Sequence, residues 1–457
     1  MSFVPFVVNP NYPVITDPAR PAWHFGPPAQ WMNDPNGVSW HEGWCHVFYQ
    51  HNPGGDAWAD MHWGHARSRD LVHWEHLPLA LRPQLTAGEK HCYSGCLART
   101  AGGEPVILYT SVPPQELEHG KSTQALATPD DADWRTWTQH VTTPFLDLAT
   151  QDGPAFRRDW RDPFVFQAEG RTFLVIGAIL GEETVVALYE NPAGDLRHWV
   201  YRGIIHREPR TQTPFLECPN LVQFGPGNKW VLLTSPCRAV EWFSGTLDLH
   251  HYTFHIERRG RLDESDHYYA THPATDPTGR IVVFGWVRNF PKNRGWNGCL
   301  GVPRRLWLDA AGDLCSEPVT EIATLRTTQA DYAPQPLSAA PIALPLPAEA
   351  MSDGELTLEL APAAQVVFEI AGVRIAFSAD GVRFDDRPAV ALGPGRIRVR
   401  WLLDCSLLEL FVNDRAAYTR VVSFPAAPVA QLHATAGTAQ LSGGRVWTLR
   451  SAPSTFA

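Results

Sequence analysis

The sequence lacks an apolar segment long enough to cross a bilayer, because no stretch reaches the roughly 18 consecutive apolar residues that a transmembrane helix needs. Its first 21 residues, MSFVPFVVNPNYPVITDPARP, lack a basic start, and Asn and Pro interrupt their apolar run. We therefore expect no secretory signal peptide. Basic residues are few, since 38 Lys and Arg oppose 48 Asp and Glu for a net charge of −10. This balance argues against nucleic acid or an anionic membrane as the main partner.

The eight cysteines form neither a C-x-x-C redox pair nor a regular disulfide framework. Even Cys92 and Cys96 are separated by three residues. Without a signal peptide, we expect reduced thiols and a cytoplasmic protein. No pattern in the sequence sets the oligomeric state, so a homo-oligomer stays open.

Helical periodicity is almost absent. Short apolar alternations bounded by Gly, Pro, Asn and Asp dominate instead, and 40 Pro and 35 Gly fit frequent tight turns. The clearest of these segments are CHVFYQ (45–50), PVILYTS (105–111), RTFLVIGAI (171–179), KWVLLTS (229–235) and RIVVFGWV (280–287). They predict an all-β protein with largely antiparallel strands.

Aromatic residues are abundant, with 18 Trp among 457 residues. Indole faces stack on the C–H surfaces of sugars, but large β-proteins also use Trp to fill their cores. Composition alone does not decide between a carbohydrate site and core packing. The length favours two to three domains, and the 44% apolar fraction is ample for packed cores.

Polar clusters recur at intervals typical of a repeated sheet. Asp34, Ser94, Asp162, Glu217 and Tyr269 follow one another at steps of 60, 68, 55 and 52 residues. Each step fits a four-stranded antiparallel blade with long loops, which predicts a five-bladed β-propeller over about residues 20–325. Inner strands of a propeller converge on a central channel, so the five clusters would meet there. Two tandem β-sandwiches are the alternative.

The composition changes near residue 326. Residues 326–349, rich in Pro and Ala, predict a linker after a catalytic domain at 1–325. Segments such as ELTLEL, QVVFEI, RIRVRWLL and LLELFVND then alternate at strand period. They predict a β-sandwich over residues 350–457. No chemical cluster marks this module, so we expect a structural role.

The stretch WMNDPNG, residues 31–37, raises the question of a site. Asp34-Pro35-Asn36-Gly37 is typical of a β-turn, since Pro presets φ and Gly tolerates positive φ. A turn does not need a Trp, a Met and an Asn before it. We expect a turn whose stiffness aims the Asp34 carboxylate into a channel.

Three carboxylates suit the hydrolysis of a glycosidic bond. Retaining hydrolysis needs a nucleophile and an acid/base about 5–5.5 Å apart across the scissile bond. Asp34 has amide donors beside it, as a nucleophile should. Glu217 has mostly apolar neighbours, which suits a general acid. Asp162 follows Arg161, a cation that should keep it ionised for stabilising positive charge. Taken singly, each has a structural explanation: a turn, an edge residue and an ion pair.

The motifs WMNDPNG, RDP and ECP, in this order, resemble glycoside hydrolase family 32, the family of invertases, levanases and inulinases. HFGPPAQWMNDPNG, HVFYQHNP and MHWGHARSRDLVHWEHLPLAL are similar to that family's first blade. CYSG, WRDP, LECPNL, DHYYA, VFGW and NRGWNGCLGVPRRL follow in the family's order. DCSLLELFVNDRAAYTR resembles its C-terminal β-sandwich, so the resemblance covers nearly the whole chain.

The resemblance implies a propeller with a C-terminal sandwich and a retaining β-fructofuranosidase that needs no cofactor. It implies Asp34 as the nucleophile, Glu217 as the general acid/base and Asp162 as the transition-state stabiliser. The fructosyl pocket would be built from Asn33, Gln50, Trp58, Tyr93, Ser94, Arg161, Tyr269 and Trp286. The expected substrates are sucrose and short fructo-oligosaccharides, which are small-molecule partners. Gln30, Tyr93 and Asn220 depart from residues common in the family (Gly, Phe and Asp), and these departures concern specificity.

A histidine cluster mimics the spacing of metal ligands, with His62 and His65 followed by His73 and His76. No Cys or carboxylate completes a ligand set, and the segment matches the family's first blade. We therefore expect these histidines to pack and hydrogen-bond within that blade, with no metal site.

Other functions stay open. A sucrose-6-phosphate hydrolase needs a cation for the phosphate, and Arg238, Lys292 and Arg294 are candidates on loops. Exo-levanase and exo-inulinase activities act on the same linkage. A non-catalytic fructan-binding propeller is the alternative from a different class, against which the retention of all three carboxylates argues.

Overall fold

The computed structural model describes residues 15–114, 122–157, 159–392, 395–424 and 430–457. The fold is all-β, as predicted. The only helices among these residues are two short 3-10 helices, η1 (Leu85–Ala87) and η2 (Thr320–Leu325). None of the described helices is long and apolar enough to cross a membrane. Residues 1–14, on which much of the signal-peptide prediction depends, lie outside the described residues.

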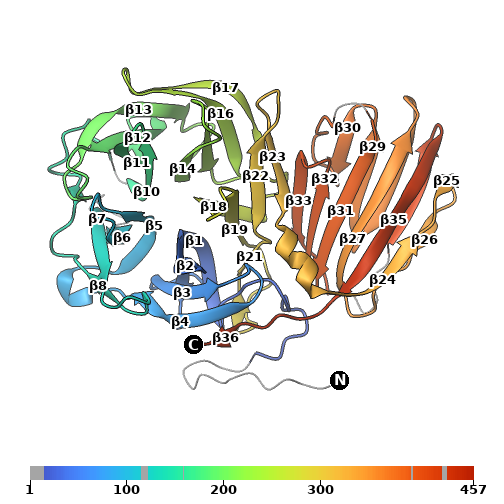
Figure 1. The fold of residues 1–457 in the computed structure, drawn as a ribbon, viewed down its shortest axis with the longest axis horizontal. Helices are drawn as coiled ribbons and strands as arrows, with labels where there is room; N and C mark the ends of the chain where they lie inside the picture. The colour runs from blue at the N-terminus through green and yellow to red at the C-terminus, as the bar shows by residue number, and fades with distance from the viewer. Residues whose placement is uncertain (1–14, 115–121, 158, 393–394, 425–429) are drawn as a thin grey trace.

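The first part of the chain forms five antiparallel sheets of consecutive strands, sheets 1 to 5 (Figure 1). Sheet 1 holds β1 (Gln30–His41), β2 (Trp44–Asn52), β3 (His62–Ser68) and β4 (Trp74–Leu81). Sheet 2 holds β5 (His91–Arg99), β6 (Pro105–Val112), β7 (Thr123–Pro129), β8 (Trp137–Gln139) and β9 (Leu146–Asp147). Sheet 3 holds β10 (Arg161–Ala168), β11 (Arg171–Leu180), β12 (Glu183–Asn191) and β13 (Val200–Pro209). Sheet 4 holds β14 (Glu217–Gln223), β15 (Trp230–Ser235), β16 (Glu241–Asp248) and β17 (Thr253–Arg261). Sheet 5 holds β18 (Tyr268–Thr275), β19 (Ile281–Val287), β21 (Cys299–Leu300), β22 (Arg304–Leu308) and β23 (Leu314–Pro318).

The first strands of these five sheets contact one another in a closed ring: β1 with β5, β5 with β10, β10 with β14, β14 with β18, and β18 with β1. Figure 1 shows these strands around a common centre, with the later strands of each sheet farther out. Residues far apart in the sequence therefore meet at the ends of the inner strands.

Two short strands join sheet 1 by parallel pairing. β20 (Trp296–Asn297) pairs with β1, and β36 (Thr455–Phe456) pairs with β4. The C-terminal strand of the chain thus lies against the first sheet.

The core of the ring lies between neighbouring sheets. In β11, RTFLVIGAIL, seven consecutive residues are buried on both faces because sheets 2 and 4 cover sheet 3. One apolar cluster joins sheets 2 to 4 and contains Leu126, Phe173 and Leu232. Burying a side chain of this kind contributes about 1.5–3 kcal/mol, so the packing fixes the inner strands.

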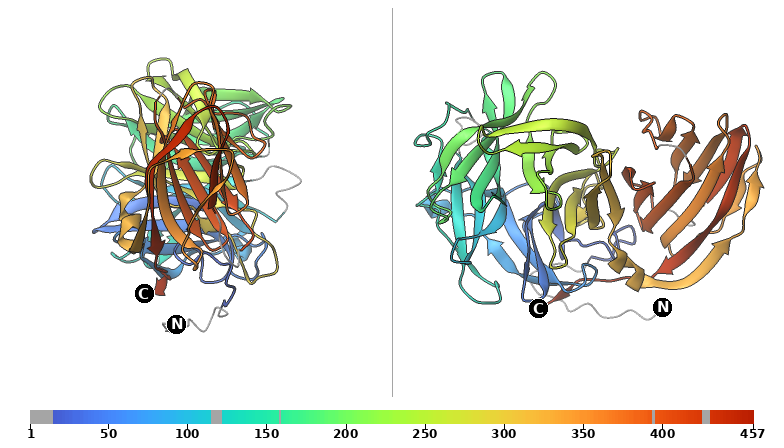
Figure 2. Two further views of the ribbon diagram at one scale, coloured as in Figure 1. Left: turned by 90° about the vertical axis from the view of Figure 1, so that its right-hand side faces the viewer. Right: turned by 45° about the horizontal axis from the view of Figure 1, so that its top comes forward.

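The C-terminal part forms two further sheets, 6 and 7 (Figure 2). Sheet 6 holds β24 (Arg326–Tyr332), β25 (Gln335–Leu337), β27 (Met351–Leu360), β31 (Ile397–Asp404), β32 (Leu407–Val412), β33 (Ala416–Val421) and β35 (Ala439–Leu449). Sheet 7 holds β26 (Ile342–Leu344), β28 (Gln365–Ile370), β29 (Val373–Ser378), β30 (Gly381–Phe384) and β34 (Ala430–Ala436). Residues of both sheets share one buried cluster. Strands β24 to β26 fall within the segment predicted as a linker and pair with β35 and β34.

A buried polar network joins sheet 6 to the ring. Arg304 of β22, fully buried, donates hydrogen bonds to Asp263 and to Glu409 of β32 at 2.9 and 3.0 Å. His24 bridges Glu409 and Asp404, with ring nitrogens 2.8 and 2.9 Å from their carboxylate oxygens. Because every charge is paired, the network is tolerated in an apolar interior and ties the two parts together.

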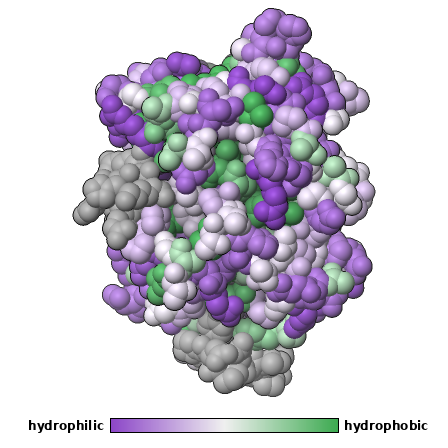
Figure 3. Space-filling model, turned by 90° about the vertical axis from the view of Figure 1, so that its left-hand side faces the viewer, coloured by the Kyte–Doolittle hydropathy of each residue, from purple (hydrophilic) through white to green (hydrophobic). Residues whose placement is uncertain are grey.

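The surface in Figure 3 is mainly hydrophilic, with small scattered apolar patches.

Candidate active site

The eleven residues that the sequence predicts for the site line one cavity of about 390 Å³. They are Asn33, Asp34, Gln50, Trp58, Tyr93, Ser94, Arg161, Asp162, Glu217, Tyr269 and Trp286, and Asp159 and Arg288 complete the lining. The volume lies in the range of small-molecule sites, about 300–1,000 Å³. The cavity lies at one end of the inner strands, where all five contribute to it.

A second cavity, of about 580 Å³, lies along later residues of the same inner strands, such as Phe164–Gln167 of β10 and Leu221–Gln223 of β14. Its lining contains a single carboxylate, Asp276, which pairs with Arg280 at 2.7 Å. The smaller cavity holds four carboxylates and is therefore the candidate for chemistry, although it is not the larger of the two.

A shift in register interrupts each inner strand where the site residues lie. The shifts fall between Met32 and Pro35, Cys92 and Gly95, Arg161 and Phe164, Glu217 and Asn220, and Tyr269 and His272. Bulges of this kind re-aim side chains and are common next to active sites. Three of the five contain a proline, which has no N–H for the ladder and is tolerated at a bulge.

The DPNG segment is part of this pattern, which corrects one expectation. It does not form a turn: residues 30–41 form the continuous strand β1, with shifts on either side of Pro35 and Asn36. Gly37 has a φ of 52°, and a Cβ there would lie 2.9 Å from the Phe48 ring. The turn-forming residues therefore serve a bulge that aims Asp34 into the cavity.

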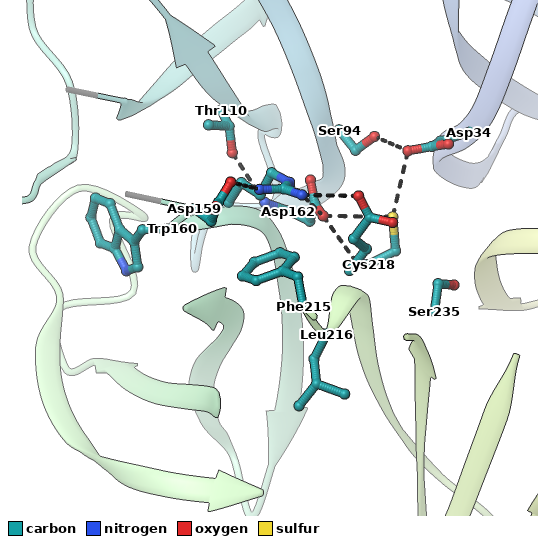
Figure 4. A network of polar contacts seen from close by, with 12 residues as sticks. Asp34, Ser94, Thr110, Asp159, Trp160, Asp162, Phe215, Leu216, Cys218 and Ser235 are labelled. Carbon is teal, nitrogen blue, oxygen red and sulfur yellow. Dashed lines mark hydrogen bonds and ion pairs between the residues drawn. The ribbon is translucent and has the colours of Figure 1, made fainter. Parts of the chain in front are cut away.

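The Asp34 carboxylate is held through both of its oxygens. Ser94 Oγ donates to Oδ2 at 2.6 Å (Figure 4), and Asn33 Nδ2 donates to Oδ1 at 3.1 Å. Asn33 is held in turn by the indole N–H of Trp31 at 2.7 Å, and Gln50 Nε2 donates to Ser94 Oγ at 3.1 Å. The carboxylate is therefore fixed in orientation with donors on both oxygens.

The Glu217 carboxylate also has two different partners. Arg161 Nη2 donates to Oε1 at 2.9 Å, and the Tyr269 hydroxyl contacts Oε2. The same hydroxyl lies 2.8 Å from the carbonyl oxygen of Ser235 and accepts the N–H of Cys237 at 2.9 Å. The Tyr269 hydroxyl therefore joins the Glu217 carboxylate to the backbone at Ser235 and Cys237.

Asp162 lies close enough to Glu217 and Asp34 for their charges to act on it. Its φ is 66°, a left-handed conformation that Asp tolerates better than most residues. Its Oδ2 accepts the N–H of Cys218 at 3.0 Å, and its own N–H donates to Thr110 Oγ1 at 3.1 Å. Cys218 Sγ lies 3.6 Å from Asp34 Oδ2 and 3.8 Å from Asp162 Oδ2. One thiol therefore touches two of the three carboxylates.

The environment shifts the pKa of two of the carboxyl groups. Burial raises the pKa of Asp162 to about 7, against the charge of Arg161, and the charge of Glu217 adds to the rise. Burial also raises the pKa of Asp34, while the hydrogen bond from Ser94 opposes the rise. Groups with perturbed pKa values gathered in a cavity are typical of catalytic sites.

Aromatic rings form the rest of the wall. Trp58, 46% exposed, lies at the mouth with Tyr93 6.1 Å away between ring centroids. Trp286 lies between Trp31 and Tyr269, with edge-on contacts at 5.6 and 6.4 Å. Ring faces beside hydrogen-bonding groups suit a sugar, which has apolar C–H faces and polar edges.

Sequence reasoning missed two lining residues. Asp159 contacts Arg161 at 2.5 Å from Nη1 to Oδ1 and lies just before the WRDP motif. Arg288 lies two residues after the VFGW motif and over the Tyr269 ring, 4.1 Å from its centroid. Their proximity to motifs was the only signal in the sequence. Cys218, interpreted from the sequence as an apolar neighbour of Glu217, proves to contact Asp34 and Asp162.

The histidines of sheet 1 contact protein groups. His65 Nε2 lies 3.0 Å from His46 Nδ1, His62 contacts the carbonyl oxygen of Asp60, and His73 contacts the Asp70 carboxylate. His76 contacts the rings of Phe25 and Phe456 at tilted angles. Packing within the sheet accounts for them. In the part of the chain that the structure describes, no group of three or more His, Cys, Asp or Glu could hold a metal ion.

Comparison with known proteins gives consistent matches. The model of the glycosyl hydrolases family 32 N-terminal domain matches residues 24–318. β-Fructofuranosidase insoluble isoenzyme 1 of Oryza sativa subsp. japonica is 29% identical over 341 residues, which cover 68% of this chain and 58% of that protein. The chain thus spans less than two thirds of the rice enzyme. Sucrose-6-phosphate hydrolase of Escherichia coli is 27% identical over 481 residues, covering 94% of each chain.

Solved structures match over nearly the whole chain. Fructan 1-exohydrolase IIa of Cichorium intybus has a TM-score of 0.83 at 22% identity, covering 97% of this chain and 99% of that one. A family 32 β-fructofuranosidase of Bombyx mori has a TM-score of 0.77 at 26% identity, covering 96% and 95%. The first of these likenesses shows the fold alone, because its identity is below 25%.

Proposed function

Since the chain belongs to glycosyl hydrolase family 32, we propose that it is a retaining β-fructofuranosidase. It hydrolyses terminal β-D-fructofuranosyl residues of sucrose and short fructo-oligosaccharides. The observation that carries the proposal is the meeting of Asp34, Asp162 and Glu217 in one cavity, although up to 183 residues separate them in the sequence.

In the first step the Asp34 carboxylate attacks C2 of the fructosyl unit. The bond from C2 to the glycosidic oxygen breaks, and the proton of Glu217 passes to that oxygen as the aglycone leaves. An ester between Asp34 and C2 results. Donors on both Asp34 oxygens hold the carboxylate in one orientation, which reduces the entropic cost of the attack.

In the second step the Glu217 carboxylate removes a proton from water, and the hydroxide oxygen bonds to C2. The ester bond breaks, so fructose leaves with its original configuration and both carboxyl groups return to their starting states. Asp162, held by Cys218 N–H and near Arg161, faces the developing oxocarbenium charge in both steps. This sequence requires no cofactor.

The remaining predicted residues would bind and orient the fructosyl unit. Asn33, Gln50 and Ser94 form a connected set of hydrogen-bonding groups beside Asp34. Trp58, Tyr93 and Trp286 supply ring surfaces at the wall and mouth. Arg161 and Tyr269 contact Glu217 directly, which supports a positioning role for both.

We also propose that sheets 1 to 5 are the blades of a five-bladed β-propeller and that sheets 6 and 7 form a β-sandwich. The closed ring of inner strands and the shared core of the last two sheets support this. The sequence predicts a catalytic domain at 1–325, a linker at 326–349 and the sandwich at 350–457. Because β24 to β26 pair with β35 and β34, we assign these three strands of the predicted linker to the sandwich. We also propose a cytoplasmic location, which the eight unpaired cysteines support; a homo-oligomer stays open.

A product assay tests the function. Purified protein is incubated with sucrose, 1-kestose, inulin and levan, and released fructose is measured. Asp34→Asn and Glu217→Gln should each lower turnover by several orders of magnitude with an unchanged circular dichroism spectrum. Glu257→Gln, which removes an exposed carboxylate on β17, should keep full activity. Near-normal turnover in either cavity variant contradicts the role assigned to that residue.

Two further measurements separate the alternatives. Methanol added as an acceptor traps the fructosyl unit, and a methyl β-D-fructofuranoside product indicates retention. Faster release from inulin or levan than from sucrose favours an exo-inulinase or exo-levanase. Binding of fructans without turnover on any substrate favours a non-catalytic propeller.

Sucrose-6-phosphate hydrolase is the second candidate activity. It is favoured by the alignment with the Escherichia coli enzyme, which covers 94% of both chains. The comparison of sucrose with its 6-phosphate as substrates distinguishes this candidate from the first.

A further inference from the structure

Arg288 lies beside the group that would protonate the leaving sugar. It follows β19 and lines the cavity, with its guanidinium carbon 4.1 Å from the centroid of the Tyr269 ring. The hydroxyl of Tyr269 contacts Glu217. If Glu217 is the acid, the adjoining part of the cavity holds the leaving group, and Arg288 borders that part.

Among the described residues, the guanidinium of Arg288 forms a hydrogen bond through only one of its three nitrogens. Its Nε donates to the carbonyl oxygen of Asp266 at 2.6 Å. The carboxylate of Asp266 pairs with Arg387 instead, at 3.1 Å. Among the described residues, no carboxylate oxygen lies within 4.0 Å of the Arg288 nitrogens, and neither Nη atom has a hydrogen-bond acceptor. The side chain is half-buried, so both Nη groups can reach a ligand.

The other cations nearby are neutralised. Arg161, which also lines the cavity, contacts Asp159, Asp162 and Glu217. Two of the three cations that the sequence suggested for a phosphate are paired as well. Arg238 contacts Glu241 at 2.9 Å and Glu208 at 3.5 Å, and Arg294 contacts Asp17 at 3.0 Å. Neither these two nor Lys292 lines the cavity.

An unneutralised guanidinium in a cavity with four carboxylates needs an explanation, because uncharged sugars are bound by neutral donors already present. Two free Nη groups match the geometry of a phosphate, which accepts parallel hydrogen bonds from one arginine. Without such a cation the carboxylates would repel an anionic substrate.

We propose that Arg288 recognises a phosphomonoester on the leaving sugar, so that the site prefers sucrose 6-phosphate over sucrose. This inference rests on the proposed function, since it assumes that the leaving sugar lies next to Glu217. It assigns the specificity to a residue that carries no catalytic role.

The kinetic test compares kcat/KM for sucrose 6-phosphate and sucrose. The wild-type ratio should exceed about 10, and Arg288→Gln should lower it by about 10- to 100-fold, the value of hydrogen bonds to a charged group. Arg294→Gln removes the same charge from the same loop outside the cavity and should leave the ratio unchanged. A wild-type ratio near one, or a ratio unaffected by Arg288→Gln, overturns the proposal.

A binding test does not depend on turnover. Titration calorimetry of the wild type should show glucose 6-phosphate binding at least about tenfold more tightly than glucose, and Arg288→Gln should remove the difference. Glucuronate or inorganic phosphate binding as tightly as glucose 6-phosphate contradicts recognition of a sugar phosphate. Protein that hydrolyses sucrose but lacks the preference refutes this inference alone. Protein that shows the preference but hydrolyses neither sugar refutes the proposed function alone.

Discussion

Ser94 Oγ donates a 2.6 Å hydrogen bond to Asp34 Oδ2, although 60 residues separate the two along the chain. Each lies in the bulge of an inner strand, Asp34 in β1 and Ser94 in β5. The bulges therefore do more than interrupt pairing. They turn side chains of neighbouring sheets toward one another at the cavity. The family resemblance implied a contact of Ser94 with the substrate but not this contact with Asp34.

Loss of the Ser94 hydroxyl should impair Asp34 in two ways. Ser94→Ala removes a hydrogen bond to a charged group, so we expect kcat on sucrose to fall by about 10- to 100-fold. The bond also opposes the rise in the pKa of Asp34 that burial causes. Because a nucleophile must be ionised, the acidic limb of the pH–kcat/KM profile should move to higher pH.

Ser94→Thr keeps a hydroxyl and is the matched control. It should restore most of the turnover and return the acidic limb toward its wild-type position. An acidic limb at the same pH in Ser94→Ala and wild type would show that this bond does not tune Asp34.

Tyr269→Phe should weaken protonation of the leaving group. The change removes the hydroxyl that contacts Glu217 Oε2 and leaves the carbonyl oxygen of Ser235 and the N–H of Cys237 without that partner. We expect kcat on sucrose to fall by about tenfold or more. Hydrolysis of p-nitrophenyl β-D-fructofuranoside, whose leaving group needs little proton assistance, should fall much less. Equal losses on both substrates would indicate a structural role for the hydroxyl.

The sequence predicts much of the site because its motifs are local. Asp34, Asp162 and Glu217 each lie in a short motif, and the recurrence of an inner strand in every sheet brings such motifs together in a ring. Asp159 and Arg288 escape prediction because they lie beside the motifs rather than in them. The place of Asp159 in the cavity depends on a left-handed backbone conformation, and that of Arg288 depends on the loop after β19. The contact of Cys218 with two carboxylates depends on a bulge that periodicity does not reveal.

The fold, like the site, could be predicted from the sequence only in part. Strand alternation predicts an all-β chain, since it reflects burial along each strand. Parallel pairing of β36 with β4 joins residues more than 370 positions apart, and only two residues of β36 take part. The DPNG segment has the composition of a turn, but the ladder between β1 and β2 continues through it with register shifts. Tertiary packing overrides local propensity in both cases.

Asp162 should make stability depend on pH. Its pKa is about 7 in the folded protein, whereas an Asp in the unfolded chain has the ordinary pKa of 3.8. Folding therefore favours the protonated form. This contribution is complete below about pH 4 and is lost as the pH rises through 7. Asp162→Asn keeps the shape and tolerates the positive φ but does not titrate. The difference in Tm, variant minus wild type, should therefore increase from pH 4 to pH 8, as measured by scanning calorimetry. A constant difference would contradict the assignment.

His24 lies where the ring of sheets 1 to 5 meets sheet 6, and it should make the stability of the fold depend on pH above about pH 6.5. Burial lowers its pKa, but hydrogen bonds with Asp404 and Glu409 outweigh burial and raise the pKa from 6.5 to about 9. The stabilisation is therefore complete below about pH 6.5 and is lost as the pH rises through 9. The Tm of the wild type should fall across this interval more steeply than the Tm of His24→Gln, which cannot carry the charge.

The same substitution at His73 is the matched control, because this histidine also contacts an aspartate but is exposed. His73→Gln should keep the wild-type slope of Tm against pH. At pH 6, His24→Gln should be less stable than wild type by about 3–5 kcal/mol, the cost of leaving a buried charge without its partner. Equal slopes in His24→Gln and wild type would show that the imidazolium does not hold Asp404 and Glu409 together. Loss of stability at pH 6 without a change in slope would assign His24 a role in packing rather than in charge pairing.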